Sequence, residues 1–207
     1  MFSRGGTLLP SIYADACYIA AVIVSKALSD YVVMPPARLA HMPTGFSFVD
    51  AAAMPTAYLT SLQGLKNNGF GRGQTLLVIG ASGGCGLAAC QLARAWGAAE
   101  VVAVCSGKNA ELVKNNGATS AIDYTSTSIA AEYPGRDGYF DMVYDAASAS
   151  GGGEDYFAEA QAVLKPGGKH VYLNGGVGKW LRVLSGFEKT NTNLVSAVEG
   201  IRILNIN

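Results

Sequence analysis

The chain has 207 residues with 15 acidic and 15 basic side chains, so its formal net charge is zero. Half of the residues are apolar and 14% are charged, a balance that supports a sizeable buried core and excludes a disordered chain. No basic run exceeds two residues, so we expect no nucleic-acid partner. The length suits one full domain plus part of another.

An apolar run over residues 16–24 lies near the N-terminus. It is too short to cross a bilayer, so no membrane association is expected. A buried strand is the favoured interpretation. A secretory signal is the alternative, and Asp15 at its border and the lack of a clear cleavage site argue against it. The four cysteines have no CxxC spacing, which favours free thiols and a cytoplasmic location.

The segment before residue 70 differs in pattern from the remainder of the chain. A short strand is expected over residues 31–34, because two prolines follow it. Ser47 is expected to cap a short helix over 50–54, with an acidic residue three positions on, as in a capping box. Pro55 is then expected to open a second helix that reaches residue 66 and ends at Asn-Asn-Gly.

From residue 75 onward, strands and helices alternate. The expected strands cover residues 76–79, 101–105, 121–123, 140–144 and 170–173, and the expected helices cover 87–96, 110–116 and 156–164. Such alternation predicts an α/β fold with a parallel, doubly wound sheet and right-handed crossovers.

The turn between the first of these strands and its helix is the most informative stretch. It reads Gly-Ala-Ser-Gly-Gly-Cys-Gly over residues 80–86. Glycines between a strand and a helix let the backbone approach a pyrophosphate, and the helix N-terminus favours negative charge. We therefore predict Rossmann-type dinucleotide binding. A purely structural glycine turn is the alternative.

The end of the next strand indicates which dinucleotide is bound. NAD-binding domains place an Asp or Glu about 20 residues after the glycine turn, where it holds the ribose 2′-hydroxyl. Here strand 101–105 is followed by Ser-Gly-Lys-Asn, so no carboxylate is available at that point of the sequence. The Ser106 hydroxyl and the Lys108 ammonium suit a 2′-phosphate instead, which predicts NADP(H). In the alternative interpretation Ser106 merely precedes a helix and Lys108 is solvated.

Further motifs follow one another in a fixed order. They are Tyr31-Val32-Val33, Ala51-Ala52-Ala53-Met54-Pro55, the glycine turn itself, Gly117-Ala118-Thr119 with Ile122-Asp123-Tyr124, Asp141 to Ala146, and Leu164-Lys165-Pro166-Gly167-Gly168. This series resembles the medium-chain dehydrogenase/reductase superfamily, and within it the zinc-free quinone oxidoreductase (zeta-crystallin-like) branch. The resemblance extends over roughly residues 30–180.

The resemblance implies a Rossmann-type domain over residues 55–207, incomplete at its C-terminus, and a remnant of a GroES-like catalytic domain with its connector over residues 1–54. It implies an NADPH-dependent, metal-free enzyme that reduces a quinone or an activated alkene. It also implies that the protein forms a homodimer. It assigns no catalytic residue. It places Ser82, Gly83, Gly84, Cys85 and Gly86 against the pyrophosphate, Ser106, Lys108 and Tyr124 around the 2′-phosphate, and Thr60, Asp145, Asn174 and Gly175 beside the nicotinamide half.

Departures from the family pattern keep other functions open. The family's N-terminal catalytic domain and its substrate-pocket residues have little counterpart, so a catalytically impaired NADP(H)-binding module is the main alternative. A SAM-dependent methyltransferase would share the run 164–168, but Ser106 stands where such enzymes usually have an acidic residue. A short-chain dehydrogenase is excluded, because no tyrosine has a lysine four residues later.

Overall fold

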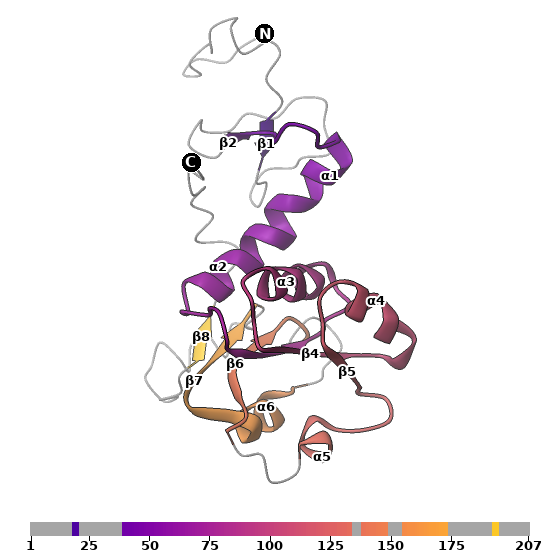
Figure 1. Ribbon diagram of the computed structural model, residues 1–207, viewed down its shortest axis with the longest axis vertical. Coiled ribbons are helices and arrows are strands. Elements are labelled where there is room, and N and C mark those ends of the chain that lie inside the picture. Colours follow the sequence, from indigo (N-terminus) through magenta and orange to yellow (C-terminus); the bar gives the residue numbers. More distant parts are fainter. Residues whose placement is uncertain (1–17, 21–38, 134–137, 149–154, 174–191, 195–207) are drawn as a thin grey trace, which may run out of the picture.

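The computed structural model describes residues 18–20, 39–133, 138–148, 155–173 and 192–194 (Figure 1). Its main element is a six-stranded parallel sheet in the order β5-β4-β3-β6-β7-β8. The strands are β3 (Thr75–Ile79), β4 (Glu100–Cys105), β5 (Ser120–Asp123), β6 (Phe140–Asp145), β7 (Leu164–Tyr172) and β8 (Thr192–Leu194). Counted from β3, this is the strand order of doubly wound dinucleotide-binding folds. The predicted fold class is confirmed.

Helices cover both faces of this sheet (Figure 1). On one face lie α2 (Thr60–Lys66), α3 (Gly84–Ala95) and α4 (Ala110–Asn115), and on the other lie α5 (Ile129–Glu132) and α6 (Phe157–Val163). Successive strand residues point to opposite faces, so Leu76 and Val78 join the first core and Leu77 and Ile79 the second. Burial on both sides explains why the strands are apolar throughout.

A continuous helical run leads into the sheet. It comprises α1 (Phe48–Ala53), the π-helical segment η3 (Met54–Leu59) and α2. The predicted capping box is confirmed, since the N–H of Asp50 donates to Ser47 Oγ at 3.1 Å and the N–H of Ser47 donates to Asp50 Oδ2 at 3.3 Å. A second helical segment does begin at this point, with Pro55 in its first turn, and the run ends at Lys66 as expected, but no break separates it from the first helix. Proline donates no backbone hydrogen bond, and the helix passes this position as a wider π-type turn instead of ending.

A second, small sheet lies at the far end of α1 from the main sheet (Figure 1). It pairs β1 (Tyr18–Ala20) with β2 (Leu39–His41) in antiparallel fashion. The strand expected within residues 16–24 therefore forms over part of that run. The strand expected over residues 31–34 lies outside the described residues. That this end of the chain is the remnant of a catalytic domain stays a prediction.

Boundaries differ most around β7. The helix expected to reach residue 164 ends at Val163, and β7 begins at Leu164, well before the expected start at residue 170. Leu164 pairs with Phe140 and Lys169 pairs with Met142, so the strand bulges over residues 165–168, for which no strand was expected. The elements α5 and β8 were not predicted. In the described part of the chain, no helix has both the length and the apolar character that a bilayer crossing requires.

Candidate dinucleotide-binding site

The strand order reverses beside β3, which has β4 on one side and β6 on the other. Ile79, the last residue of β3, pairs with both Val104 and Asp145, so the carboxyl ends of the three strands lie level with one another. In open α/β sheets, ligands bind in the crevice outside such a reversal point. The predicted glycine turn follows β3 directly and therefore lies at this crevice.

Two glycines of the turn are required by geometry. Gly80 has a φ of +74°, and a Cβ there would lie 3.0 Å from the Cβ of Ala147 in the loop after β6. At Gly86 a Cβ would lie 2.3 Å from the carbonyl oxygen of Gly80 and 2.6 Å from Ala81 Cα. The first glycine therefore allows a tight turn, and the second lets α3 start directly against the strand end.

The start of α3 offers backbone donors to an anion. Gly83 is the N-cap residue, and the N–H of Leu87 donates to its carbonyl at 2.8 Å. The preceding N–H groups of the first helical turn have no acceptor within the helix, and Gly83 and Gly84 are exposed. Burial raises the pKa of the Cys85 thiol, so this side chain stays neutral and adds no negative charge to the turn.

Ser61 tethers this turn to α2, although no sequence pattern pointed to it. The side chain is fully buried, and its Oγ lies 2.8 Å from the carbonyl oxygens of Cys85 and Ala57 and from the hydroxyl of Tyr144. A serine hydroxyl has one proton, which it donates to a carbonyl oxygen, so Tyr144 must be the donor to Ser61. The predicted residue Thr60 is also buried, and its contact with a cofactor stays a prediction.

Three residues that were predicted to surround the 2′-phosphate lie at the ends of β4 and β5. Ser106 follows β4 and accepts a hydrogen bond from Asn109 Nδ2 at 3.1 Å. Lys108 is exposed in the short 3₁₀ segment η4 (Gly107–Asn109). Tyr124 follows β5, is 45% exposed, and donates its N–H to the carbonyl of Cys105 at 3.3 Å. The structure therefore brings the predicted 2′-phosphate residues to neighbouring strand ends.

The residues that directly follow β4 include no carboxylate, as expected, but a carboxylate of the neighbouring strand β5 lies beside them. Asp123, the last residue of β5, receives a hydrogen bond from the N–H of Gly107, where a Cβ would lie 2.3 Å from Asp123 Oδ2. Hydrogen bonds from the Thr125 hydroxyl and N–H, together with that of Gly107, hold the pKa of Asp123 below its usual range. The carboxylate comes from the neighbouring strand, because Cys105 and Asp123 pair in register.

Asp145, which was predicted to lie beside the nicotinamide half, ends β6 and precedes a loop. Asp145 is fully buried, and its Oδ1 accepts the N–H groups of Ala147 at 3.0 Å and Ser148 at 2.8 Å. Burial raises the pKa of Asp145, but His170 and Ser148 lower it more, so the group stays ionised. The carboxylate is covered by the loop 146–148, and a contact of Asp145 with a cofactor stays a prediction. The predicted residues Asn174 and Gly175 lie outside the described residues.

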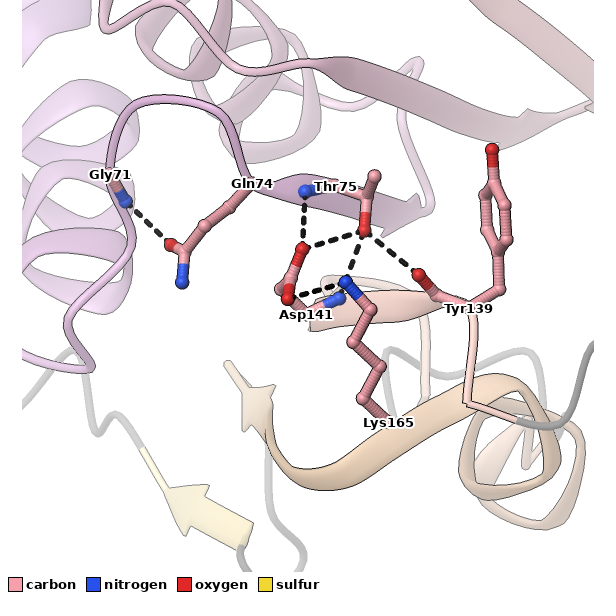
Figure 2. A network of polar contacts seen from close by, with 6 residues as sticks. All are labelled: Gly71, Gln74, Thr75, Tyr139, Asp141 and Lys165. Carbon is pink, nitrogen blue, oxygen red and sulfur yellow. Dashed lines mark hydrogen bonds and ion pairs between the residues drawn. The ribbon is translucent and has the colours of Figure 1, made fainter.

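The opposite, amino-terminal edge of the sheet carries a polar network of its own (Figure 2). The N–H of Thr75 donates to Asp141 Oδ2 at 2.8 Å, and the Thr75 hydroxyl lies 2.9 Å from the same oxygen. Lys165 Nζ donates to Asp141 Oδ1 at 2.7 Å. This network joins β3, β6 and β7 at the end away from the glycine turn, so its role is structural.

Within the described ranges, no group of three or more His, Cys, Asp or Glu side chains could hold a metal ion.

Three features together are typical of a dinucleotide-binding α/β domain: the reversal of strand order at β3, the glycine turn, and the exposed N-terminus of α3. Residues 84–191 match the family model of zinc-binding dehydrogenases. The chain belongs to this family, and so to the NAD(P)H oxidoreductases of the medium-chain dehydrogenase/reductase superfamily, as its motifs predicted.

Named relatives are reductases of small molecules. The chain is 39% identical to 2-methylene-furan-3-one reductase of Solanum lycopersicum and 36% identical to a chloroplastic NADPH-dependent alkenal/one oxidoreductase of Arabidopsis thaliana. Each match extends over 152 residues, which is 73% of this chain and 36% of the relative. The quinone oxidoreductase of Thermus thermophilus, whose complex with NADPH has been solved, matches with a TM-score of 0.65 and 27% identity over 85% of this chain and 55% of that one.

Proposed function

We propose that the protein binds NADPH along the carboxyl-terminal edge of its sheet and transfers hydride to a quinone or an activated alkene. The observation that supports this best is the arrangement of the glycine turn beside Ser106 and Lys108 on the neighbouring strand end. A hydroxyl and an ammonium suit the charge of a 2′-phosphate. NADPH is also named for two related proteins, the Arabidopsis alkenal/one oxidoreductase and the Thermus quinone oxidoreductase.

The chain's own residues would bind and orient the cofactor, and the nicotinamide supplies the hydride when bound. In this proposal residues 82–86 hold the pyrophosphate through backbone N–H groups. Ser106, Lys108 and Tyr124 hold the 2′-phosphate, and Thr60, the loop after Asp145, and residues 174–175 adjoin the nicotinamide half. The homodimer and the cytoplasmic location stay predictions.

Titration with NADPH and NADH, followed by nucleotide fluorescence, tests the cofactor assignment. Lys108→Ala should weaken NADPH binding about tenfold, the loss expected for one charge-assisted hydrogen bond, and change NADH binding less than twofold. Lys114→Ala is the matched control. Lys114 is also an exposed lysine, but it lies in the last turn of α4, beside Glu111.

Equal affinities of the unmodified protein for NADPH and NADH would overturn the 2′-phosphate assignment, and binding of neither would overturn the cofactor assignment. A turnover assay with NADPH and a simple quinone or enone then tests the chemistry. Tight binding without NADPH oxidation would favour the alternative, an NADP(H)-binding module that does not turn over.

A further inference from the structure

A buried ionisable pair lies beneath the loop after β6. Asp145 and His170 are both fully buried, and Asp145 Oδ2 lies 3.7 Å from His170 Nε2. Neither atom has a hydrogen-bond partner among the described residues. Buried polar atoms are nearly always hydrogen-bonded, because leaving them unpaired costs free energy. Two such atoms face each other here, at the carboxyl-terminal edge of the sheet, where the glycine turn also lies. Their position therefore needs an explanation.

The His170 ring is held tightly in place. It stacks on Phe157 of α6 and on Tyr172 of β7, with centroid separations of 5.6 and 4.3 Å, and these two rings also contact each other at 6.1 Å. Gln161 Nε2 lies 3.1 Å from His170 Nδ1. With the amide as donor, Nδ1 is the acceptor, so the neutral ring carries its proton on Nε2, which faces the carboxylate of Asp145. The ring thereby presents a fixed positive dipole to Asp145.

Asp145 in turn shapes the loop that follows it. Its Oδ1 accepts the N–H groups of Ala147 and Ser148, and Ser148 Oγ accepts the N–H of Tyr156 at 3.3 Å. The loop packs on the first glycine of the cofactor turn, since a Cβ on Gly80 would lie 3.0 Å from Ala147 Cβ and 3.1 Å from its nitrogen. A chain of contacts therefore leads from α6 through His170 and Asp145 to Gly80.

The position of this loop relative to a dinucleotide follows from the topology. A doubly wound sheet consists of two mononucleotide-binding halves that meet at the reversal point. The half with β3, β4 and β5 carries Ser106 and Lys108 and takes the adenosine end in the proposed function. The half with β6, β7 and β8 carries the loop 146–148, so this loop adjoins the nicotinamide end.

We propose that Asp145 and His170 are positioning residues for the nicotinamide half of the cofactor. The pair fixes the loop 146–148, and the loop, seated against Gly80, sets where the nicotinamide ribose lies. Neither side chain touches the cofactor itself. This inference rests on the proposed function, and it goes beyond it by naming how the second half of the site is held.

Two ligands and three variants of the full chain test this inference. NADPH reaches both halves of the site, whereas adenosine 2′,5′-bisphosphate reaches only the adenosine half. Asp145→Asn places an amide N–H against His170 Nε2–H and should raise the Kd for NADPH about tenfold, with the Kd for the bisphosphate changed less than twofold. His170→Phe retains the ring stack with Phe157 and Tyr172, and should raise the Kd for NADPH roughly fivefold.

Asp141→Asn is the matched control, because Asp141 lies on the same strand at the opposite edge. It should lower the unfolding midpoint and leave both Kd values within twofold. Unchanged NADPH binding in folded Asp145→Asn, or equal weakening of both ligands, would overturn the inference. If that variant does not fold, His170→Phe decides by the same criterion. If the unmodified protein binds neither ligand, the proposed function fails and the inference with it; normal binding by all variants would overturn the inference alone.

Discussion

Strand β6 has an aspartate near each end, and the two carboxylates are held in different ways. Asp141, at the amino-terminal edge, has one oxygen on Thr75 and the other on Lys165, and its side chain is 23% exposed. Asp145, at the carboxyl-terminal edge, is fully buried, and its Oδ2 lies 3.7 Å from His170 Nε2 without a hydrogen-bond partner in the described part of the chain. Both carboxylate oxygens of Asp141 are hydrogen-bonded and connect neighbouring strands. One carboxylate oxygen of Asp145 has no hydrogen-bond partner among the described residues.

The same contrast extends over both edges of the sheet. At the amino-terminal edge, polar side chains are hydrogen-bonded to one another across the strands (Figure 2). At the carboxyl-terminal edge, glycines lie directly against neighbouring backbone, and the first N–H groups of α3 have no acceptor within the helix. Polar groups left without partners in the protein are available to a ligand but add little to stability. We therefore expect mutations at the first edge to affect folding alone, and those at the second to affect binding as well.

The largest effect is expected at Gly86. Gly86→Ala would place a methyl group 2.3 Å from the carbonyl oxygen of Gly80, against rigid backbone. We expect a loss of about 3 kcal/mol or more in the free energy of unfolding, and no measurable NADPH binding. Chemical denaturation measures the first quantity. Gly71→Ala is the control, since a Cβ there meets nothing within 4 Å, and a loss of similar size in this variant would contradict the prediction.

At the amino-terminal edge, Asp141→Asn should cost roughly 2 kcal/mol at pH 7, the scale of hydrogen bonds to a charged group. Burial raises the pKa of Asp141, but Lys165 and Thr75 lower it more, so the net pKa lies below the usual value of about 3.9. Such a group stabilises the fold fully above the unfolded pKa, and this contribution is lost as pH falls through the folded pKa.

The difference in unfolding free energy between Asp141→Asn and the unmodified protein should therefore stay constant at neutral pH and shrink as pH falls below about 4. Denaturation series at several pH values measure this difference. Lys165→Met is the companion variant. Because Lys165 is 40% exposed, its loss should cost under about 1 kcal/mol. A pH-independent difference for Asp141→Asn would contradict the assignment.

Ser61→Ala tests the tether between α2 and the glycine turn. The variant leaves the buried Tyr144 hydroxyl without its acceptor Ser61 Oγ, and should cost about 1.5 kcal/mol. Because the Cys85 carbonyl also loses its contact with Ser61, we expect NADPH to bind a few times more weakly. Tyr58→Phe is the control, since Tyr58 donates to Gln91 and so links η3 to α3 without touching the turn. Isothermal titration should show unchanged affinity in this control.

The smallest effect is expected at Asp123. Asp123→Asn keeps an acceptor for the N–H of Gly107 but removes a negative charge from the proposed 2′-phosphate region. NADPH should bind roughly threefold more tightly at low salt, and NADH should be unaffected, because exposed charges interact weakly and are screened. The gain should disappear at about 0.5 M salt, where the screening length is only a few ångströms. A gain of the same size for NADH would contradict the electrostatic explanation.

Much of the sheet was predictable because its strands are apolar runs between turn residues. Parallel strands buried on both faces make such runs, and β3, β4, β5 and β6 lie within two residues of their expected positions. The start of β7 was missed, since a bulge accommodates a Pro-Gly-Gly run that elsewhere forms a turn. Pro55 stands at the start of a helical segment as predicted, but the π-type turn that joins this segment to α1 has no sequence signal that we recognised.

In the site, the local motifs were predictable and the long-range contacts were not. The glycine turn is a contiguous pattern, so its role could be stated from sequence. Ser61 and His170 act through partners far away in the chain, and neither has a local signal. Asp123 could have been found, because in this strand order β5 lies beside β4, and their carboxyl ends are neighbours.

The uninterrupted helix from α1 to α2 links two distant parts of the molecule. Its segments of six, six and seven residues follow one another without a break. Phe48 and Val49 at its start are 70% and 81% exposed, whereas Tyr58 and Ser61 further along attach it to Gln91 of α3 and to the carbonyl of Cys85. The helix that holds the glycine turn therefore also contacts the small N-terminal sheet.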